Sequence, residues 1–348
     1  MSYRKRWIGS AIASMRHHAE AVNLEQHYYC KASKLSAELQ ASWVQLHYDQ
    51  ECHRFVESCE DVSWTQTFAA SCLMSCFGWS VTDTNGFLNR GQMHVLSTLQ
   101  FRQLLSSSLP TSKTSSIPTS SSPDTSPTSS SSTSSSSISS SSISRTSVGG
   151  MGPFSLVEPE DPVGVKLLDV GAGDGHVTQH LARLFRSVVA TEVSQPMVGR
   201  LQERGWDAIL TASVEKEVVG GDFDCVAFLN VLDRCDRPFS MLQQMRRLLT
   251  ASTASGRPGV LLIAVVLPFR PFVESGADQL RPTERFKQLE RCSTFEAAAS
   301  SLAATVFAPA GLRVRAFSRV PYISRGDMNQ SFYLLSDAIF VLEPLSFD

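Results

Sequence analysis

The chain has 348 residues, of which 42% are hydrophobic and 18% are charged, and its formal net charge is −2. This composition is typical of a folded globular protein and excludes a fibrous or wholly disordered chain. The near-neutral charge excludes nucleic acid or an anionic membrane as a partner held by bulk electrostatics, so specificity must come from a local site. Eight cysteines without a CxxC pair indicate reduced thiols in an intracellular compartment such as the cytoplasm, with association to a membrane organelle as the alternative.

The N-terminus, MSYRKRWIGSAIASMRHH, places basic residues before a short apolar run at residues 8–15. This run is too short to span a bilayer and marginal as the hydrophobic part of a signal peptide. We interpret it as an exposed basic start, with a weak targeting segment as the alternative. No integral membrane span is expected in the chain.

Residues 24–105 are predicted to be mainly helical. In LSAELQASWVQLHYDQECHRFVESC the apolar residues recur at intervals of three and four, and WTQTFAASCLMSCFGWSV predicts a second, more apolar helix. No strand alternation is visible in this segment. NGFLNRGQM, at residues 85–93, contains two glycines and an arginine and is predicted to be a loop.

Serine, threonine, proline and glycine dominate residues 106–152. Such a composition cannot bury enough apolar surface to offset the entropy of ordering it, so it predicts a disordered linker. The predicted organisation is therefore an N-terminal helical segment at residues 1–105, a linker at 106–158, and a domain at 159–348 on which the N-terminal segment packs.

After the linker, short β-rich runs alternate with amphipathic runs, which is typical of a parallel sheet covered by helices on both faces. The predicted strands are 166–170, 188–192, 208–211, 225–229 and 260–267. The predicted helices are 176–185, 196–204, 239–249 and 294–307. Strands at 313–317 and 332–341 have no convincing helix between them, so we expect an antiparallel hairpin to close the sheet. The fold class is therefore α/β with a seven-strand sheet.

LLDVGAGDG, at residues 167–175, follows the first predicted strand with three glycines at alternate positions. Asp169 ends this strand, and Gly171, Gly173 and Gly175 permit positive φ angles and a close approach between backbone and ligand. The helix that follows presents unsatisfied N–H groups at the edge where ligands of open α/β sheets bind. A plain structural turn is the alternative for this motif taken alone.

Two nucleotide-type cofactors suit this turn. A dinucleotide fold prefers GxGxxG, whereas this sequence has an acidic residue followed by GxGxG, which resembles the first motif of class I S-adenosylmethionine-dependent methyltransferases. Glu192 ends the second predicted strand, where a carboxylate can accept hydrogen bonds from both ribose hydroxyls. This carboxylate occurs with both cofactors and so does not choose between them.

Polar residues follow the fourth predicted strand in DFDCVAFLNVLDRCDRP. Asn230 and Asp233 come directly after its apolar run, at the carboxyl edge of the sheet and beside the reactive end of a bound cofactor. We predict functional roles for both residues. Asp236 and Pro238 are predicted to cap the next helix.

No metal site is expected. The candidate ligands near the N-terminus lack the paired spacing of zinc ligands. They are His17, His18, His27 and Cys30. His176 and His180 lie one turn apart after the glycine turn and, without a nearby acidic or thiol partner, are predicted to lie on the helix surface.

Several motifs together resemble one family. They are LLDVGAGDG, ATEVSQPM, LNVLDRCDRP, LPFRPFVE and RVPYISRGDM, with GFLNRGQM before the linker. They are similar to motifs of the DREV or methyltransferase-like-9 family of protein-histidine N-pros methyltransferases, and the resemblance covers nearly the whole chain apart from the extreme N-terminus and the serine/threonine tract. LDRCDRP and LPFRPFVE are much more specific than the glycine motif.

The resemblance implies a class I methyltransferase fold with an N-terminal helical extension. It also implies methyl transfer from S-adenosyl-L-methionine to the N-pros nitrogen of histidine in His-x-His motifs of proteins, where x is small. The implied catalytic residue is Asp233, which addresses the substrate imidazole. The implied cofactor-binding residues are Asp169, Gly171, Gly173, Gly175, Glu192, Asn230 and Tyr322. The implied substrate-binding residues are Asn89, Arg90 and Asp327.

The chain departs from the family pattern in two ways. A long serine/threonine insertion separates the N-terminal helices from the second domain, and the usual apolar N-terminal leader is not evident, so the location in the cell does not carry over. Two alternatives stay open. One is a class I methyltransferase that acts on another protein side chain or a small molecule, and the other is an inactive methyltransferase-fold scaffold.

Overall fold

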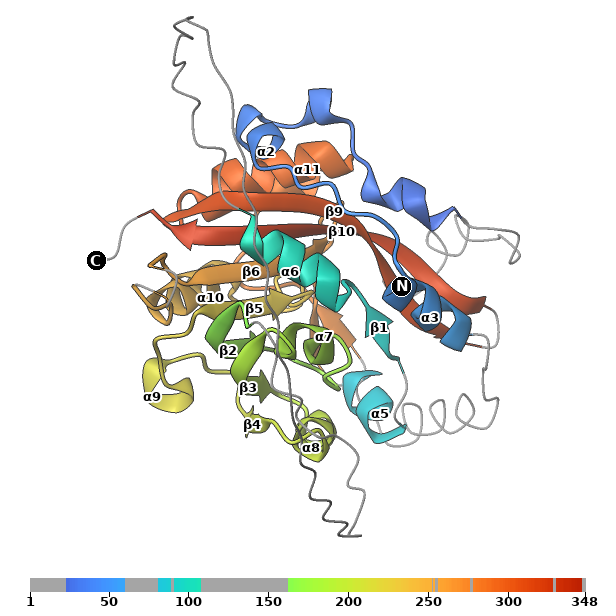
Figure 1. Cartoon of the computed structure of the whole chain (residues 1–348), viewed down its shortest axis with the longest axis vertical. Coiled ribbons are helices and arrows are strands. Elements are labelled where there is room, and N and C mark those ends of the chain that lie inside the picture. Colours follow the sequence, from blue (N-terminus) through green and yellow to red (C-terminus); the bar gives the residue numbers. More distant parts are fainter. Residues whose placement is uncertain are drawn as a thin grey trace, which may run out of the picture. The chain divides into compact units, whose positions relative to one another are not determined.

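The computed structural model describes residues 23–59, 81–88, 91–107, 162–251, 253, 256–275, 278–327 and 330–345. The predicted apolar helix at 64–81 and the predicted linker at 106–158 lie outside these residues, apart from residues 81, 106 and 107. The described residues before and after the serine/threonine tract belong to one compact unit, shown in Figure 1.

One mixed sheet organises this unit, in the order β1-β9-β10-β6-β5-β2-β3-β4. Its strands are β1 Met93–His94, β2 Gly164–Val170, β3 Phe185–Glu192, β4 Asp207–Leu210, β5 Cys225–Leu229, β6 Val260–Val266, β9 Leu312–Asp327 and β10 Gln330–Pro344. β2 to β6 are parallel, and β10 runs antiparallel to both β6 and β9. The α/β class and all seven predicted strands are confirmed, with the predicted hairpin as β9 and β10. The order reverses where β2 lies between β3 and β5, which is where such sheets bind ligands.

Helices cover both faces of this sheet. They are α2 Ala37–Ala41, α3 Gln50–Ser58, α5 Val81–Leu88, α6 Thr98–Ser106, α7 Thr178–Ala182, α8 Gln195–Glu203, α9 Lys216–Val219, α10 Pro238–Arg247 and α11 Phe295–Leu302. Shorter turns are η1 Leu24–Tyr28, η2 Ala32–Lys34, η3 Leu289–Arg291 and the π-helical η4 Ala303–Phe307, which continues α11.

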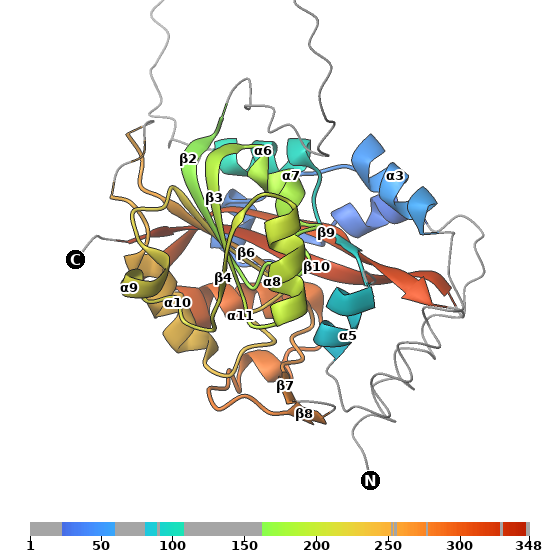
Figure 2. The same cartoon turned by 90° about the horizontal axis from the view of Figure 1, so that it is seen from below.

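Consecutive strand residues point to opposite faces, so each face has its own core. Phe228 packs in the core formed with α2, α10 and α11, whereas Ala227 packs in the core formed with α6 and α7. Figure 2 shows α6 and α7 on one side of the central strands and α10 and α11 on the other. The continuous apolar run of each parallel strand follows from this burial on both sides.

The predicted helix over residues 35–59 is wrong in its middle. Only α2 and α3 form, and residues 43–49 between them are not helical. Trp43 instead forms an isolated β-bridge with Phe317 of β9, where the N–H of Val44 donates to the carbonyl of Phe317 over 2.8 Å. The backbone hydrogen bonds of this segment therefore go to the edge of the sheet, which overrides its local helical pattern.

Other boundaries also differ from the sequence predictions. β1 is a strand in a segment where none was predicted, and the predicted loop at 85–93 begins with the last residues of α5 and ends in β1. The helix predicted to reach residue 185 stops at Ala182, because Phe185 already pairs with Gly164 in the sheet. A small hairpin of β7 Val273–Ser275 and β8 Asp278–Leu280 was not predicted.

The predicted cap of α10 is only half correct. Pro238 does begin the helix, but Asp236 accepts hydrogen bonds from Thr283 instead of from the helix. The N–H groups of Phe239 and Ser240 donate to Oε2 of Glu284 over 2.8 and 3.0 Å. A carboxylate from 44 residues further along the chain thus caps the helix. Among the helices that the structure describes, none is long and apolar enough to cross a membrane.

Candidate active site

The glycine turn lies between β2 and α7, at the carboxyl edge of the sheet. Gly171, Gly173 and Gly175 have φ angles of +71°, +58° and +77°, which L-residues with a side chain rarely adopt. The turn therefore requires glycine for its backbone conformation at all three positions.

The space beside each glycine separates their roles. A Cβ added at Gly175 would meet the Trp206 ring at 2.5 Å, and one added at Gly171 would meet Cγ2 of Val231 at 2.8 Å. A Cβ at Gly173 would meet nothing within 4 Å. Gly171 and Gly175 thus permit packing inside the protein, whereas Gly173 leaves open space where a ligand can approach the backbone.

Glu192 ends β3 beside this turn. Its Oε2 accepts the N–H of Gly173 over 2.9 Å, and its Oε1 accepts the N–H groups of Val193 and Ser194. These bonds fix the carboxylate next to the open side of the glycine turn. Oε2 accepts only one of these bonds and keeps a second lone pair, so Glu192 can still accept a hydrogen bond from a ribose there.

Asp169 is buried under the turn and accepts the hydroxyl of Thr178 over 2.7 Å. Burial raises the pKa of its carboxyl to about 7, the Thr178 hydrogen bond opposes the rise, and the charge of Glu192 adds to it. The contact that the structure shows for Asp169 joins β2 to α7. Its predicted contact with the cofactor stays a prediction.

Asn230 follows β5 at the same edge, with a φ angle of +59°. Its Nδ2 donates to both carboxylate oxygens of Asp337, over 2.8 and 2.9 Å. Asp337 lies on β10 and is fully buried, and this burial raises the pKa of its carboxyl to about 8. Asp337 was not predicted, and its only signal in the sequence is a carboxylate within a mostly apolar strand.

Asp233 lies one turn beyond Asn230 and is only 2% exposed. Its Oδ2 pairs with Nη1 of Arg234, while its buried Oδ1 has no hydrogen-bond partner among the described residues. Burial raises the pKa of this carboxyl, and the charge of Arg234 opposes the rise. A buried acceptor without a partner is costly, so this oxygen marks a place where a donor from a ligand is needed.

Tyr322 comes to this group from β9, and its hydroxyl contacts Sδ of Met93. Burial and the nearby charge of Asp337 raise the pKa of Tyr322, which stays protonated at neutral pH. The charge of Asp233 also raises this pKa, and the charge of Arg234 lowers it. The structure thus brings together the predicted residues Asn230, Asp233 and Tyr322.

A family model of DREV methyltransferases matches residues 28–118 and 155–344. The chain belongs to the DREV methyltransferase family. It is therefore a class I methyltransferase whose cofactor is S-adenosylmethionine.

Solved structures with a similar fold include the N-methyltransferase NodS from Bradyrhizobium japonicum, in complex with S-adenosyl-L-homocysteine. It is 11% identical, with a TM-score of 0.32, and the match covers 53% of this chain and 79% of that chain. The magnesium protoporphyrin IX methyltransferase ChlM from Synechocystis, with bound S-adenosylmethionine, is 14% identical at a TM-score of 0.33, with 52% and 71% covered. These likenesses are distant, and the fold assignment rests on the strand order of the sheet.

The residues at the carboxyl edge of this DREV methyltransferase fit its cofactor. Gly173 leaves room for a ligand beside the backbone, and Glu192 offers its Oε2 to a ribose. Val231 packs on Gly171, which joins the glycine turn to the segment that carries Asn230 and Asp233. A ligand that lies across β2, where the strand order reverses, and extends from Glu192 to Asp233 therefore contacts both the glycine turn and the segment after β5.

The N-terminal segment of the DREV methyltransferase also reaches this edge. Oγ of Ser194, two residues after Glu192, donates to Oδ1 of Asp83 on α5 over 2.6 Å, and Met93 of β1 contacts Tyr322. Of the predicted substrate-binding residues, Asn89 and Arg90 lie outside the described residues. Asp327 is the last residue of β9, and its side chain also lies outside them.

The prediction that His176 and His180 lie on the helix surface is wrong. Nδ1 of His180 lies 3.1 Å from Oε2 of Glu51 on α3, and its ring contacts that of His94 on β1 at a centroid distance of 5.5 Å. His94 is 1% exposed, and burial lowers its pKa to about 3, with His180 and His176 adding to the effect. Phe55 packs against both His94 and His176. The acidic partner comes from a distant segment, which the local sequence could not show.

Proposed function

We propose that this methyltransferase modifies histidine in proteins, by transferring a methyl group to the N-pros nitrogen in His-x-His motifs where x is small. The observation that carries the proposal is Oδ1 of Asp233, which is buried at the carboxyl edge of the sheet and has no hydrogen-bond partner in the described part of the chain. The family resemblance of LDRCDRP and LPFRPFVE supports the same acceptor.

A neutral imidazole suits such a site. Its ordinary pKa is about 6.5, so at neutral pH one ring nitrogen already carries a free lone pair and no strong general base is needed. What the enzyme must supply is the choice of nitrogen. A carboxylate oxygen that accepts the N–H of the tele nitrogen selects the tautomer whose pros nitrogen is free.

The contacts of Asp233 support this role. Arg234 occupies its Oδ2, and the guanidinium of Arg234 in turn stacks on the ring of Phe272 at 4.1 Å. The N–H of Phe272 donates to the carbonyl of Asp233 over 2.9 Å, which fixes the backbone of the same turn. Oδ1 is therefore the oxygen that remains for a ligand, and its orientation is set before the substrate binds.

Bound S-adenosylmethionine supplies a methyl group on a positively charged sulfur, which is a good leaving group. The lone pair that Asp233 leaves free on the pros nitrogen would accept this methyl group, and the electrons of the broken S–C bond would stay on sulfur. The ring becomes a cation, and its tele N–H strengthens its hydrogen bond to Asp233. The tele proton would then pass to water, directly or through the Asp233 carboxylate.

Methyl transfer from labelled S-adenosylmethionine to a His-Ala-His peptide, with the modified nitrogen located by NMR, tests the proposal. Asp233→Asn keeps the size of the side chain but replaces one acceptor oxygen by an amide donor. We expect turnover to fall by roughly ten- to a thousandfold, and cofactor affinity measured by calorimetry to change by less than about twofold.

Asp236→Asn is the matched control, because Asp236 lies on the same segment but is bonded to the exposed Thr283. This variant should retain full turnover. Full pros-specific turnover in Asp233→Asn would refute the role of Asp233. Cofactor binding without any transfer to the peptide would show that another acceptor is used, and absence of cofactor binding would favour the inactive scaffold.

A further inference from the structure

A cavity of about 200 Å³ lies at the opposite edge of the sheet from the glycine turn. Gly164, Phe185, Cys225 and Val260 begin β2, β3, β5 and β6, and the last three of these residues line the cavity. The amino ends of parallel strands share one edge and the carboxyl ends share the other. This cavity is therefore separate from the methyl-transfer site.

Arg315 of β9 lines the cavity and is only 6% exposed. One of its terminal nitrogens donates to the carbonyl of Leu105, at the end of α6, while its buried Nε has no hydrogen-bond partner in the described part of the chain. The charge of Glu343 also acts on Arg315, but Glu343 pairs with Arg313. A buried guanidinium without a paired carboxylate is costly, and an anionic ligand would remove that cost.

Two further arginines line the same cavity. Arg257 is exposed and Arg102 is half-buried on α6. Burial and the charge of Arg257 both lower the pKa of Arg315, so the positive charges act on one another. Asp224 is the opposing charge in the lining, and its Oδ2 accepts the backbone N–H groups of Val165 and Lys166.

We propose that this cavity binds a phosphate group. Arg257 and Arg315 outnumber the one carboxylate of the lining, and the planar forks of arginine match the oxygens of a dianion such as phosphate. A cavity of this volume holds the phosphate and a few of the atoms attached to it. The proposal does not depend on the identity of the methyl acceptor.

The phosphate group has two possible sources, a free phosphate-bearing ligand or a phosphoserine. The sequence offers the second within this chain. Ser106, which lines the cavity, is the first residue of the serine/threonine tract, and Pro162, which also lines it, follows the tract closely.

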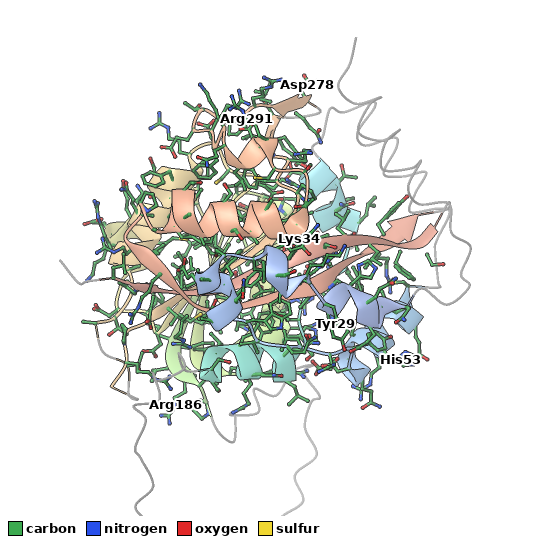
Figure 3. All side chains as sticks on the ribbon, turned by 90° about the horizontal axis from the view of Figure 1, so that it is seen from above. Tyr29, Lys34, His53, Arg186, Asp278 and Arg291 are labelled. Carbon is green, nitrogen blue, oxygen red and sulfur yellow. The ribbon has the colours of Figure 1, made fainter. Side chains whose placement is uncertain are left out.

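Calorimetric titration of the full-length, unphosphorylated protein with inorganic phosphate tests the proposal, with chloride at matched ionic strength as the reference. Arg257→Gln removes one charge from the exposed rim and leaves the buried Arg315 in place. We expect it to weaken phosphate binding by about five- to tenfold. Arg291→Gln is the control, because Arg291 is an exposed arginine on η3 that does not line the cavity. Figure 3 shows Arg291 on the opposite side of the molecule from Arg186, which follows the cavity residue Phe185 in β3.

A second titration uses a peptide copy of residues 106–122 with one phosphoserine, and its unphosphorylated twin. Tighter binding of the phosphopeptide than of phosphate assigns the site to the serine/threonine tract, and equal binding assigns it to a free ligand. Either result supports the site if Arg257→Gln weakens binding of the probe and Arg291→Gln does not. Failure of both probes to bind, or equal losses in the two variants, would overturn the proposal.

Discussion

Substitution of Gly173 by alanine separates cofactor binding from folding. The added Cβ meets no protein atom within 4 Å, so the only cost to folding is a positive φ angle of +58°. A left-handed conformation costs an L-residue roughly 1–2 kcal/mol, and the smaller entropy of unfolded alanine offsets part of this. We therefore expect the free energy of unfolding to fall by about 1 kcal/mol and the fold to persist.

Cofactor affinity should respond far more strongly. The Cβ enters the open space beside the backbone, next to the N–H group that donates to Glu192. Displacement of a bound cofactor by even a few tenths of an ångström would loosen its contacts with the turn. We expect the affinity for S-adenosylmethionine, measured by calorimetry, to fall at least about tenfold, which corresponds to about 1.4 kcal/mol.

Gly256→Ala is the matched control for this experiment. Gly256 has a φ angle of +72°, and a Cβ there also meets nothing within 4 Å, but it lies before β6 at the opposite edge of the sheet. The two variants should lose similar stability in urea unfolding, and only Gly173→Ala should lose affinity. Equal cofactor affinity in the two folded variants would refute the assignment of the glycine turn.

Three further predictions concern stability and are measured by urea unfolding. Gly175→Ala should lower the free energy of unfolding by several kcal/mol, because its Cβ would meet the Trp206 ring at 2.5 Å; a loss of about 1 kcal/mol or less would contradict the observed packing. The pKa of Asp337 is raised to about 8, so between its ordinary value of 3.8 and pH 8 the folded protein holds a proton that the unfolded chain has lost. As the pH rises from about 4 to about 8, the wild type should accordingly lose stability relative to Asp337→Asn. If the free energies of unfolding of the two proteins change in parallel with pH, the raised pKa of Asp337 is disproved. The pKa of His94 is lowered to about 3, so below its ordinary value of 6.5 only the unfolded chain takes up that proton. His94→Asn should therefore lessen the loss of stability on acidification from about pH 7 to about pH 5, by up to about 1.4 kcal/mol per pH unit, and equal losses in His94→Asn and the wild type would contradict the shift.

The strand and helix pattern after residue 162 could be predicted because it depends on local periodicity. Apolar runs such as residues 260–266 are buried on both faces, and each is followed by a turn or an amphipathic helix. The glycine turn and Glu192 could also be located, since both lie at the ends of predicted strands. Asn230 and Asp233 were found for the same reason.

The helical pattern of residues 35–59 shows where such reasoning fails. Its apolar spacing suits a helix, but the carbonyl of Ser42 and the N–H of Val44 pair with Phe317 of β9, more than 270 residues further along the chain. Likewise Glu284 caps α10 and Glu51 approaches His180, and neither partner is near in sequence. Tertiary contacts override the helix propensity of a short segment when its backbone has partners elsewhere in the fold.

By itself the sequence determined the α/β class, the hairpin that closes the sheet, the glycine turn and the polar residues after β3 and β5, because each depends on neighbours within one strand or turn. Only the tertiary structure decided that Asp337 holds Asn230. It also decided that, among the described residues, one oxygen of Asp233 has no partner and the buried Arg315 has no paired carboxylate. These features are set by side chains that meet across the sheet from distant segments. Burial and pairing are properties of the packed chain, which no local pattern encodes.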